Sequence, residues 1–144
     1  MRVALGSDMP GALPEAVDAW LRRHGHEVTR LGALHSGGDV PWTDVARELG
    51  ALVAGGSADS GVLCCWTGTG VSIAANKVAG VRAALCGDAA TAAGARQWND
   101  ANVLCLSLRA TAPALAEEML GAWFATGPTH DPEYRAMIDA IRNA

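Results

Sequence analysis

The sequence predicts an α/β fold, in which helices cover both faces of a five-stranded parallel sheet. Short apolar runs alternate along the chain with longer segments of helical spacing, an alternation typical of parallel sheets. Residues 61–66 are apolar without interruption, as expected for a strand buried on both faces. Seventeen glycines and few aromatic residues indicate a core of small and aliphatic side chains in close helix–sheet contact.

The first three elements follow from local patterns. Residues 2–8 form an apolar strand that ends in Gly-Ser-Asp. A helix over residues 13–24 has apolar side chains on one face, and Gly25 ends it. Residues 26–31 alternate between polar and apolar, which favours a strand at the edge of the sheet.

The middle of the chain contains the buried strand and the glycine turn that follows it. A glycine-rich loop over residues 32–42 precedes a helix over residues 43–54, for which Thr43 is the expected N-cap. The buried strand over residues 61–66 leads through a glycine turn into a helix that starts near Val71. The remaining elements are a strand over 82–86, a helix capped by Asp88 that runs to Trp98, a strand over 103–107, and helices over 113–124 and 132–142.

Composition and cysteine usage exclude several classes of protein. The net charge of −4, without a cluster of basic residues, argues against nucleic-acid binding. No apolar run reaches the roughly 20 residues that a membrane span needs, and no signal peptide follows Met1. The four cysteines lack the spacing of a zinc site, so we expect reduced thiols, no metal and no cofactor. Residues 1–144 are expected to form one cytoplasmic domain.

The turn after Cys65 predicts a ligand site. Gly68 and Gly70 allow close approach of a ligand to the backbone and permit positive φ. Ligands of open α/β sheets bind at the carboxyl ends of the strands, where Cys65 is expected. The following helix directs unpaired N–H groups toward that crevice. A thiol in such a position is available as thiolate near neutral pH, so we expect a site for an anion, or a developing anion, with a base beside it.

Four motifs, in this order, carry a family resemblance. The chain reads GSD near its start, C-W-T-G-T-G followed by S-I-A-A-N-K, then G-V-R-A-A-L-C, and finally A-R-Q-W-N-D-A-N-V-L. It resembles the ribose-5-phosphate isomerase B family, which includes the galactose-6-phosphate isomerase subunits. The resemblance covers nearly the whole chain and weakens after about Trp123.

The resemblance implies a three-layer, Rossmann-like α/β/α fold and a homodimer, alone or paired into a tetramer, with active sites shared between subunits. The helix over residues 132–142 would then pack on a partner. It also implies metal-free interconversion of an aldose phosphate and a ketose phosphate through an enediolate, with ribose 5-phosphate and ribulose 5-phosphate of the pentose phosphate pathway as the default pair.

By position, the resemblance makes Cys65 the group that moves the proton, with Thr67 and Asp8 as further catalytic residues. The loop containing Trp66, Gly68, Thr69 and Gly70 would hold the enediolate oxygens. Asp8 would orient sugar hydroxyls. Asn99 would contact substrate, and Arg109 would bind phosphate.

Several positions depart from the family pattern. Met9 and Trp98 stand where the family has histidines, and tryptophan cannot transfer the proton that opens a furanose ring. The arginines of the family's tail are missing, which leaves phosphate binding to Arg109, together with Arg135 or His130. Trp42 and Trp66 replace smaller family residues and are expected to narrow the substrate pocket.

The sequence is compatible with three functions. The first is an isomerase for ribose 5-phosphate. The second is a divergent isomerase for another sugar, either an open-chain tetrose phosphate, which needs no ring opening, or a sugar without phosphate. The third is a sugar-binding protein without catalysis.

Overall fold

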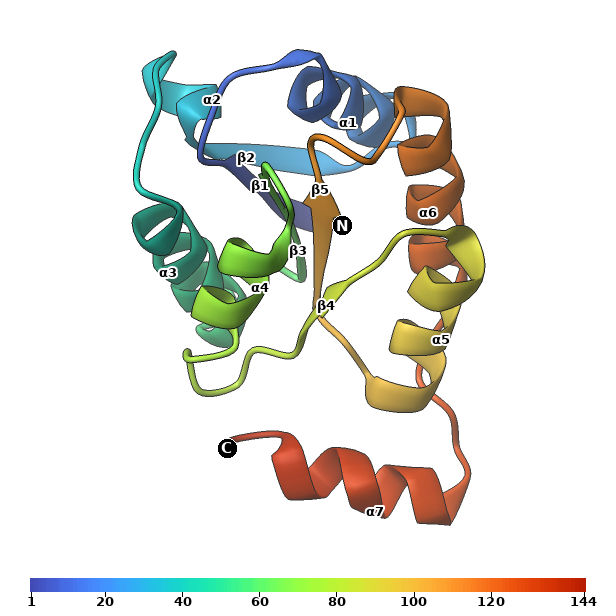
Figure 1. Ribbon diagram of the computed structural model, residues 1–144. Coiled ribbons are helices and arrows are strands. Elements are labelled where there is room, and N and C mark those ends of the chain that lie inside the picture. Colours follow the sequence, from blue (N-terminus) through green and yellow to red (C-terminus); the bar gives the residue numbers. More distant parts are fainter.

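The computed structural model describes residues 1–144 and confirms the predicted fold class. Its sheet has five strands, all parallel, in the order β2-β1-β3-β5-β4, with helices on both faces (Figure 1). The strands are β1 (Arg2–Ser7), β2 (Glu27–Gly32), β3 (Ser60–Cys65), β4 (Ala83–Leu85) and β5 (Val103–Ser107). The helices are α1 (Ala12–Arg23), α2 (Ala33–Ser36), α3 (Trp42–Ala54), α4 (Thr69–Ala75), α5 (Ala89–Asn99), α6 (Pro113–Ala125) and α7 (Pro132–Ile141).

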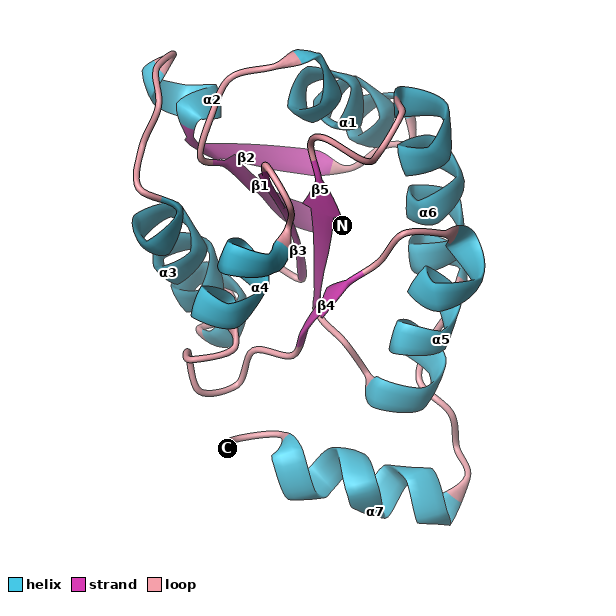
Figure 2. Cartoon of the chain, in the orientation of Figure 1, coloured by secondary structure: helices cyan, strands magenta, loops and turns pink.

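Two hydrophobic clusters lie on opposite faces of the sheet. Helices α1, α5 and α6 cover one face, while α3 and α4 cover the other (Figure 2). Successive strand residues alternate between the two clusters, because side chains along a strand point to opposite sides. Cys64 accordingly belongs to the first cluster and Cys65 to the second. This alternation brings Cys65 to the face covered by α3 and α4.

The chain reverses its direction across the sheet between β1 and β3. From β1 it moves outward to β2, and it then returns to place β3 on the other side of β1. In open α/β sheets, ligands bind outside the carboxyl ends of the strands at such a switch point. Asp8 directly follows β1 and Cys65 ends β3, and the Asp8 N–H donates to the Cys64 carbonyl at 3.3 Å. The topology therefore brings these two residues to the switch point.

Helix α7 lies outside the three layers. It extends below them in the view of Figure 1, and it packs mainly against α5. Ile138 is its only buried residue, whereas Tyr134, Met137 and Ile141 are exposed. These three exposed side chains follow i, i+3, i+7 spacing and so form one stripe along the helix.

Two local expectations are wrong. Residues 32–42 do not form a continuous loop, because α2 (Ala33–Ser36) forms one short helical turn within it. Thr43 does not cap α3: the helix starts one residue earlier and its N-cap is Pro41, with no side-chain capping bond. The Thr43 hydroxyl instead donates to Asp44 at 3.5 Å. The expected edge position of β2 and the Asp88 cap of α5 are both confirmed, the latter by a bond from the Thr91 N–H to the Asp88 carboxylate.

None of the helices combines the length and apolar character that spanning a bilayer requires. No group of three or more histidine, cysteine or carboxylate side chains is arranged to hold a metal ion.

Candidate active site

One cavity at the carboxyl edge of the sheet gathers the expected catalytic side chains. It has a volume of about 310 Å³ and opens between the ends of β1 and β3 and the start of α4. Its lining residues are all ones for which the sequence predicts a site role: Asp8, Trp42, Cys65, Trp66, Thr67, Thr69 and Gly70. Residues separated by more than fifty positions in the chain thus meet at the switch point of the sheet.

The turn between β3 and α4 depends on its two glycines. Gly68 has φ +75° and caps α4, and a Cβ there would lie 3.0 Å from the Leu106 carbonyl carbon. A Cβ at Gly70 would lie 3.0 Å from the Trp42 indole. Larger residues would therefore distort the turn at either position. The turn brings Thr69 and Gly70, whose N–H groups lie in the first turn of α4, to the cavity.

Asp8 has an oxygen with no partner inside the protein. Its Oδ1 is buried and accepts no hydrogen bond. Burial raises the pKa of the Asp8 carboxyl, and the charge of Asp39 acts in the same direction. A buried acceptor without a partner costs free energy. Asp8 also lines the cavity, so its carboxyl can accept a hydrogen bond from a ligand hydroxyl there.

The four cysteines differ in what surrounds them. All are buried and none forms a disulfide. Burial raises the pKa of Cys64 to about 12 and of Cys86 to about 11, and raises that of Cys105 well above its usual value. These three thiols stay protonated at neutral pH. Cys65 is the only cysteine that shares a cavity with Asp8.

Two neighbouring cavities extend the site along the sheet edge. One, of about 300 Å³, is lined by Met9, Trp66, Leu108 and other uncharged residues. The other, of about 330 Å³, is lined by Thr67, Arg109 and Cys86 among others. Trp66 and Thr67 each border the cavity of Cys65 as well. Met9 and Arg109 therefore lie beside the cavity of Cys65, in spaces that adjoin it.

Ser107 is a site residue that the sequence analysis missed. Its hydroxyl donates to the Trp66 carbonyl at 2.9 Å and accepts from the Ala110 N–H at 3.2 Å. It thereby joins the loop after β3 to the turn that carries Arg109. Its place as the last residue of a predicted strand is the signal that could have indicated it.

Three residues with expected site roles lie elsewhere in the protomer. Trp98 packs against Tyr134 of α7, with 4.6 Å between ring centroids. Asn99 lines a different cavity, of about 390 Å³, with Arg82 and Ile141. Arg135 lies in the first turn of α7. None of the three lines the cavity of Cys65.

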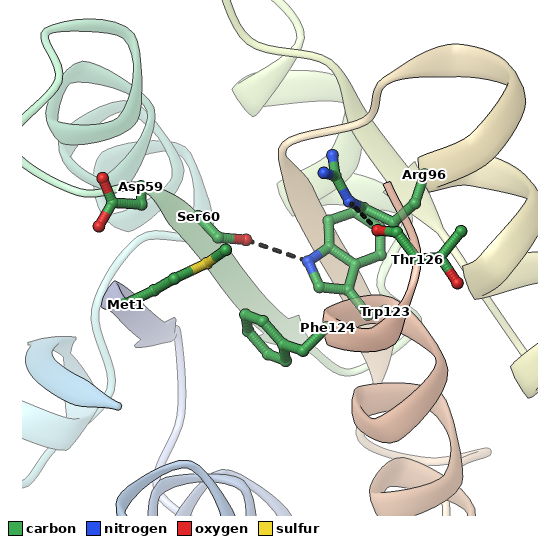
Figure 3. Close-up of a pocket in the computed structure, with 7 residues that line it drawn as sticks. All are labelled: Met1, Asp59, Ser60, Arg96, Trp123, Phe124 and Thr126. Carbon is green, nitrogen blue, oxygen red and sulfur yellow. Dashed lines mark hydrogen bonds between the residues drawn. The ribbon is translucent and has the colours of Figure 1, made fainter. Parts of the chain in front are cut away.

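A fifth cavity lies by Ser60, at the opposite end of β3 from Cys65. Figure 3 shows it between Ser60, Trp123 and Arg96, with the Trp123 indole N–H donating to Ser60 at 3.0 Å. Its volume of about 50 Å³ is enough for one or two waters and too small for a sugar phosphate. We regard it as a packing feature of the fold.

Fold and site together define a small α/β enzyme with a thiol and a carboxyl at the switch point of a parallel sheet. A family profile described as Ribose/Galactose Isomerase matches residues 3–141. The chain belongs to this family, and it is a sugar-phosphate isomerase that interconverts an aldose and a ketose.

Similar proteins agree on this assignment and differ in substrate. The chain is 39% identical to "Ribose-5-phosphate isomerase B" of Escherichia coli, over 99% of both chains. It is 37% identical to "D-erythrulose-4-phosphate isomerase" of Pectobacterium atrosepticum, over 85% of this chain and 82% of that one. The solved type B ribose 5-phosphate isomerase of Trypanosoma brucei superposes with a TM-score of 0.90 at 41% identity, over 98% and 96% of the two chains.

Proposed function

We propose that Cys65 is the base that moves the proton between C1 and C2 of an open-chain sugar phosphate. The observation that carries the proposal is the shared cavity: Cys65, Asp8 and the Thr67–Gly70 turn all border it. An aldose–ketose isomerase needs a base at a carbon acid and donors at the oxygen where charge develops. This cavity offers both.

The proposed reaction has two proton transfers at carbon. The Cys65 thiolate removes the C2 proton of the aldose, and the electrons move through the C1–C2 bond onto O1, forming an enediolate. N–H groups of the turn and the Thr67 hydroxyl stabilise that oxygen. The same thiol then returns the proton to C1 while the O2 hydroxyl proton passes to O1, which leaves a carbonyl at C2. Asp8, which lines the cavity, orients the sugar hydroxyls.

We further propose that a second copy of the chain completes each site. Apart from Met1, the exposed large apolar side chains form two groups. One surrounds the catalytic turn: Trp42, Trp66, Ile73 and Leu85. The other lies on α5 and α7: Trp98, Tyr134, Met137 and Ile141. In a two-fold dimer, the first group of each subunit can face the second group of the other. That arrangement would bring Trp98, Asn99 and Arg135 to the partner's Cys65 cavity.

Ribose 5-phosphate and ribulose 5-phosphate are the default substrates, with Arg109 as the phosphate anchor. One observation favours a second candidate, a four-carbon sugar 4-phosphate. Trp98 cannot transfer the proton needed to open a furanose ring, since indole is a donor only. A tetrose 4-phosphate cannot close such a ring, because its terminal hydroxyl carries the phosphate. The similarity to a D-erythrulose-4-phosphate isomerase supports this candidate.

Proton exchange and isomer formation in deuterated buffer test the proposal. Ribose 5-phosphate, erythrose 4-phosphate and D-erythrulose 4-phosphate are each followed by NMR with the wild-type protein. Cys65→Ala should lower kcat/KM about 10²- to 10⁴-fold, the range that loss of a general base produces. Cys64→Ala is the matched control, because that thiol lies on the opposite face of the same strand, and its turnover should stay close to wild type.

The outcomes separate the candidates. Efficient turnover of ribose 5-phosphate would remove the four-carbon candidate, while turnover of the tetrose phosphates alone would establish it. Full turnover by folded Cys65→Ala would overturn the assignment of the base. Folded wild-type protein that exchanges no proton on any of the three sugars would favour a binding role.

A further inference from the structure

We infer that Asp100 is a positioning residue, which holds Trp98, Asn99 and α7 in the arrangement that completes a second copy's active site. This inference rests on the proposed function and assigns a role to a residue outside the catalytic cavity. Asp100 lies directly after α5, and its carboxylate meets three arginines from three different elements.

The first observation concerns the backbone conformation of Asp100. It is the only residue other than glycine with positive φ, at +47°. Asp100 is the C-cap of α5, and its N–H donates to the Ala95 carbonyl. Aspartate tolerates this left-handed conformation better than most side chains do. The chain therefore turns sharply just after Asn99, and this turn fixes the direction of the last turn of α5.

The second observation concerns the arginines that surround the Asp100 carboxylate. Its oxygens lie 3.4 Å from Arg82, 3.3 Å from Arg96 and 3.8 Å from Arg142, which come from the start of β4, from α5 and from the end of α7. The Asp100 side chain is only 16% exposed, and Arg82 and Arg96 are similarly shielded. Breaking a shielded ion pair by removing one partner leaves uncompensated charge. Here the loss of one carboxylate would leave three guanidinium groups facing one another.

Each of these arginines extends the attachment into the body of the protein. Arg96 also donates to the Thr126 carbonyl at 3.3 Å and lies 5.6 Å from the centre of the Trp123 ring (Figure 3). Arg82 donates to the Asp100 carbonyl at 2.7 Å, and its own N–H donates to Asn102 at 2.7 Å. The turn after α5 is thereby tied to the start of β4 and to the end of α6.

Arg142 makes the connection to α7. Ile138 is the only buried residue of that helix, so the Asp100–Arg142 pair and the Trp98–Tyr134 contact are important attachments. Asn99 lies one residue before Asp100, and Trp98 lies two residues before it. One carboxylate therefore restrains both parts of the protomer that we propose reach the partner's site.

Asp100 acts through these neighbours and has no direct catalytic part. It lines none of the five cavities, and its oxygens are occupied by arginines. The first test compares Asp100→Asn with Asp139→Asn. Asparagine keeps the left-handed turn and removes only the charge. Asp139 is the other carboxylate that pairs with Arg142, but it is 63% exposed.

Asp100→Asn should lower kcat about 10- to 100-fold, the effect of a small misplacement of substrate-contacting groups, with a smaller change in KM. Amide hydrogen exchange in α7 should accelerate, while exchange in β1, β3 and β5 stays slow. Asp139→Asn should leave kcat and exchange unchanged. Wild-type kcat and unchanged α7 exchange in Asp100→Asn would overturn the proposal.

Hybrid dimers supply a test that a general loss of stability cannot mimic. One subunit carries Cys65→Ala and the other Asp100→Asn. If Asp100 positions groups for the partner's site, one site of the hybrid has both Cys65 and Asp100 intact, and the hybrid should show about half of wild-type activity. If Asp100 acts only within its own subunit, the hybrid dimer contains no intact site. Hybrid activity no higher than that of the Asp100→Asn protein would therefore overturn the proposal.

The exchange measurement keeps this test separate from the proposed function. A wild-type protein without isomerase activity would refute the function, whereas the effect of Asp100→Asn on α7 would still be measured. Accelerated exchange would then support the role of Asp100 as the attachment of α7, and unchanged exchange would refute it.

Discussion

The sheet with its six flanking helices and the helix α7 bury their apolar side chains to very different extents. In β1, β3 and β5 nearly every side chain is fully buried, and the two clusters fill both faces of the sheet. In α7 only Ile138 is buried, and three large apolar side chains face outward. Both regions have the apolar periodicity of ordinary secondary structure.

The difference shows that apolar periodicity predicts which face of a helix will be buried. It does not predict whether that face is buried by the same chain or by a second copy. The stripe of α1 packs on the sheet of its own chain. In the equally regular stripe of α7, Tyr134 packs on Trp98 of α5, whereas Met137 and Ile141 stay half exposed within the protomer. Folding of the chain accounts for the first, and we propose that self-association accounts for the second. Three substitutions test this division.

The largest effect is expected in the sheet. Leu63→Ala removes a fully buried side chain from β3 and should lower the free energy of unfolding by about 2–5 kcal/mol, because a cavity remains where the surroundings cannot collapse. Urea denaturation followed by circular dichroism measures it. A loss well below 1 kcal/mol would mean that β3 is far less tightly packed than the clusters indicate.

In α7 we expect a substitution to change self-association and not the stability of the subunit. Met137→Asp places a charge in the exposed stripe and should weaken self-association by at least about tenfold, as a disrupted interface centre does, with little effect on the unfolding of the subunit. Sedimentation velocity over a concentration series measures this. Ala114→Asp, an exposed alanine on α6, is the control and should assemble as wild type does. Equal association of the two variants would show that the α7 stripe is no interface.

The smallest effect is expected at Asp8 and depends on pH. Because burial raises its pKa in the folded state, the Asp8 carboxyl favours folding when protonated, and this contribution is lost as pH rises through the folded-state pKa. Asp8→Asn should therefore raise Tm slightly at neutral pH. In acid, below the ordinary carboxyl pKa of about 4, the two proteins should converge. Thermal denaturation at several pH values checks the trend, and a lower Tm for the variant at neutral pH would contradict it.

Much of the fold was predictable because each element has a strong local pattern. The five strands and six of the helices follow from runs and periodicities that lie within single segments. The helix α2 (Ala33–Ser36) did not, since four residues cannot show a helical period. The strand order β2-β1-β3-β5-β4 also cannot be predicted from any local pattern, because it depends on contacts between distant strands.

The candidate site divides in the same way. Asp8, Cys65 and the turn that follows were expected at strand ends, and the parallel sheet brings them together. Trp98, Asn99 and Arg135 were expected at the same site, but one protomer does not bring them there, and no sequence pattern says which subunit a residue serves. Asp100 was missed, although aspartate is one of the few side chains that accept a left-handed conformation at a helix end.

The turn after α5 also bears on how such a chain can change its substrate. At position 100 the backbone requires a residue that accepts positive φ, and the arginines require a negative charge. Asparagine and glycine meet only the first requirement, and glutamate meets only the second. Met9 and Trp98 carry no such double constraint, since neither forms an ion pair or a special turn. We therefore expect substitutions at Met9 and Trp98 to alter substrate preference, while the aspartate at position 100 keeps the turn after α5 in place.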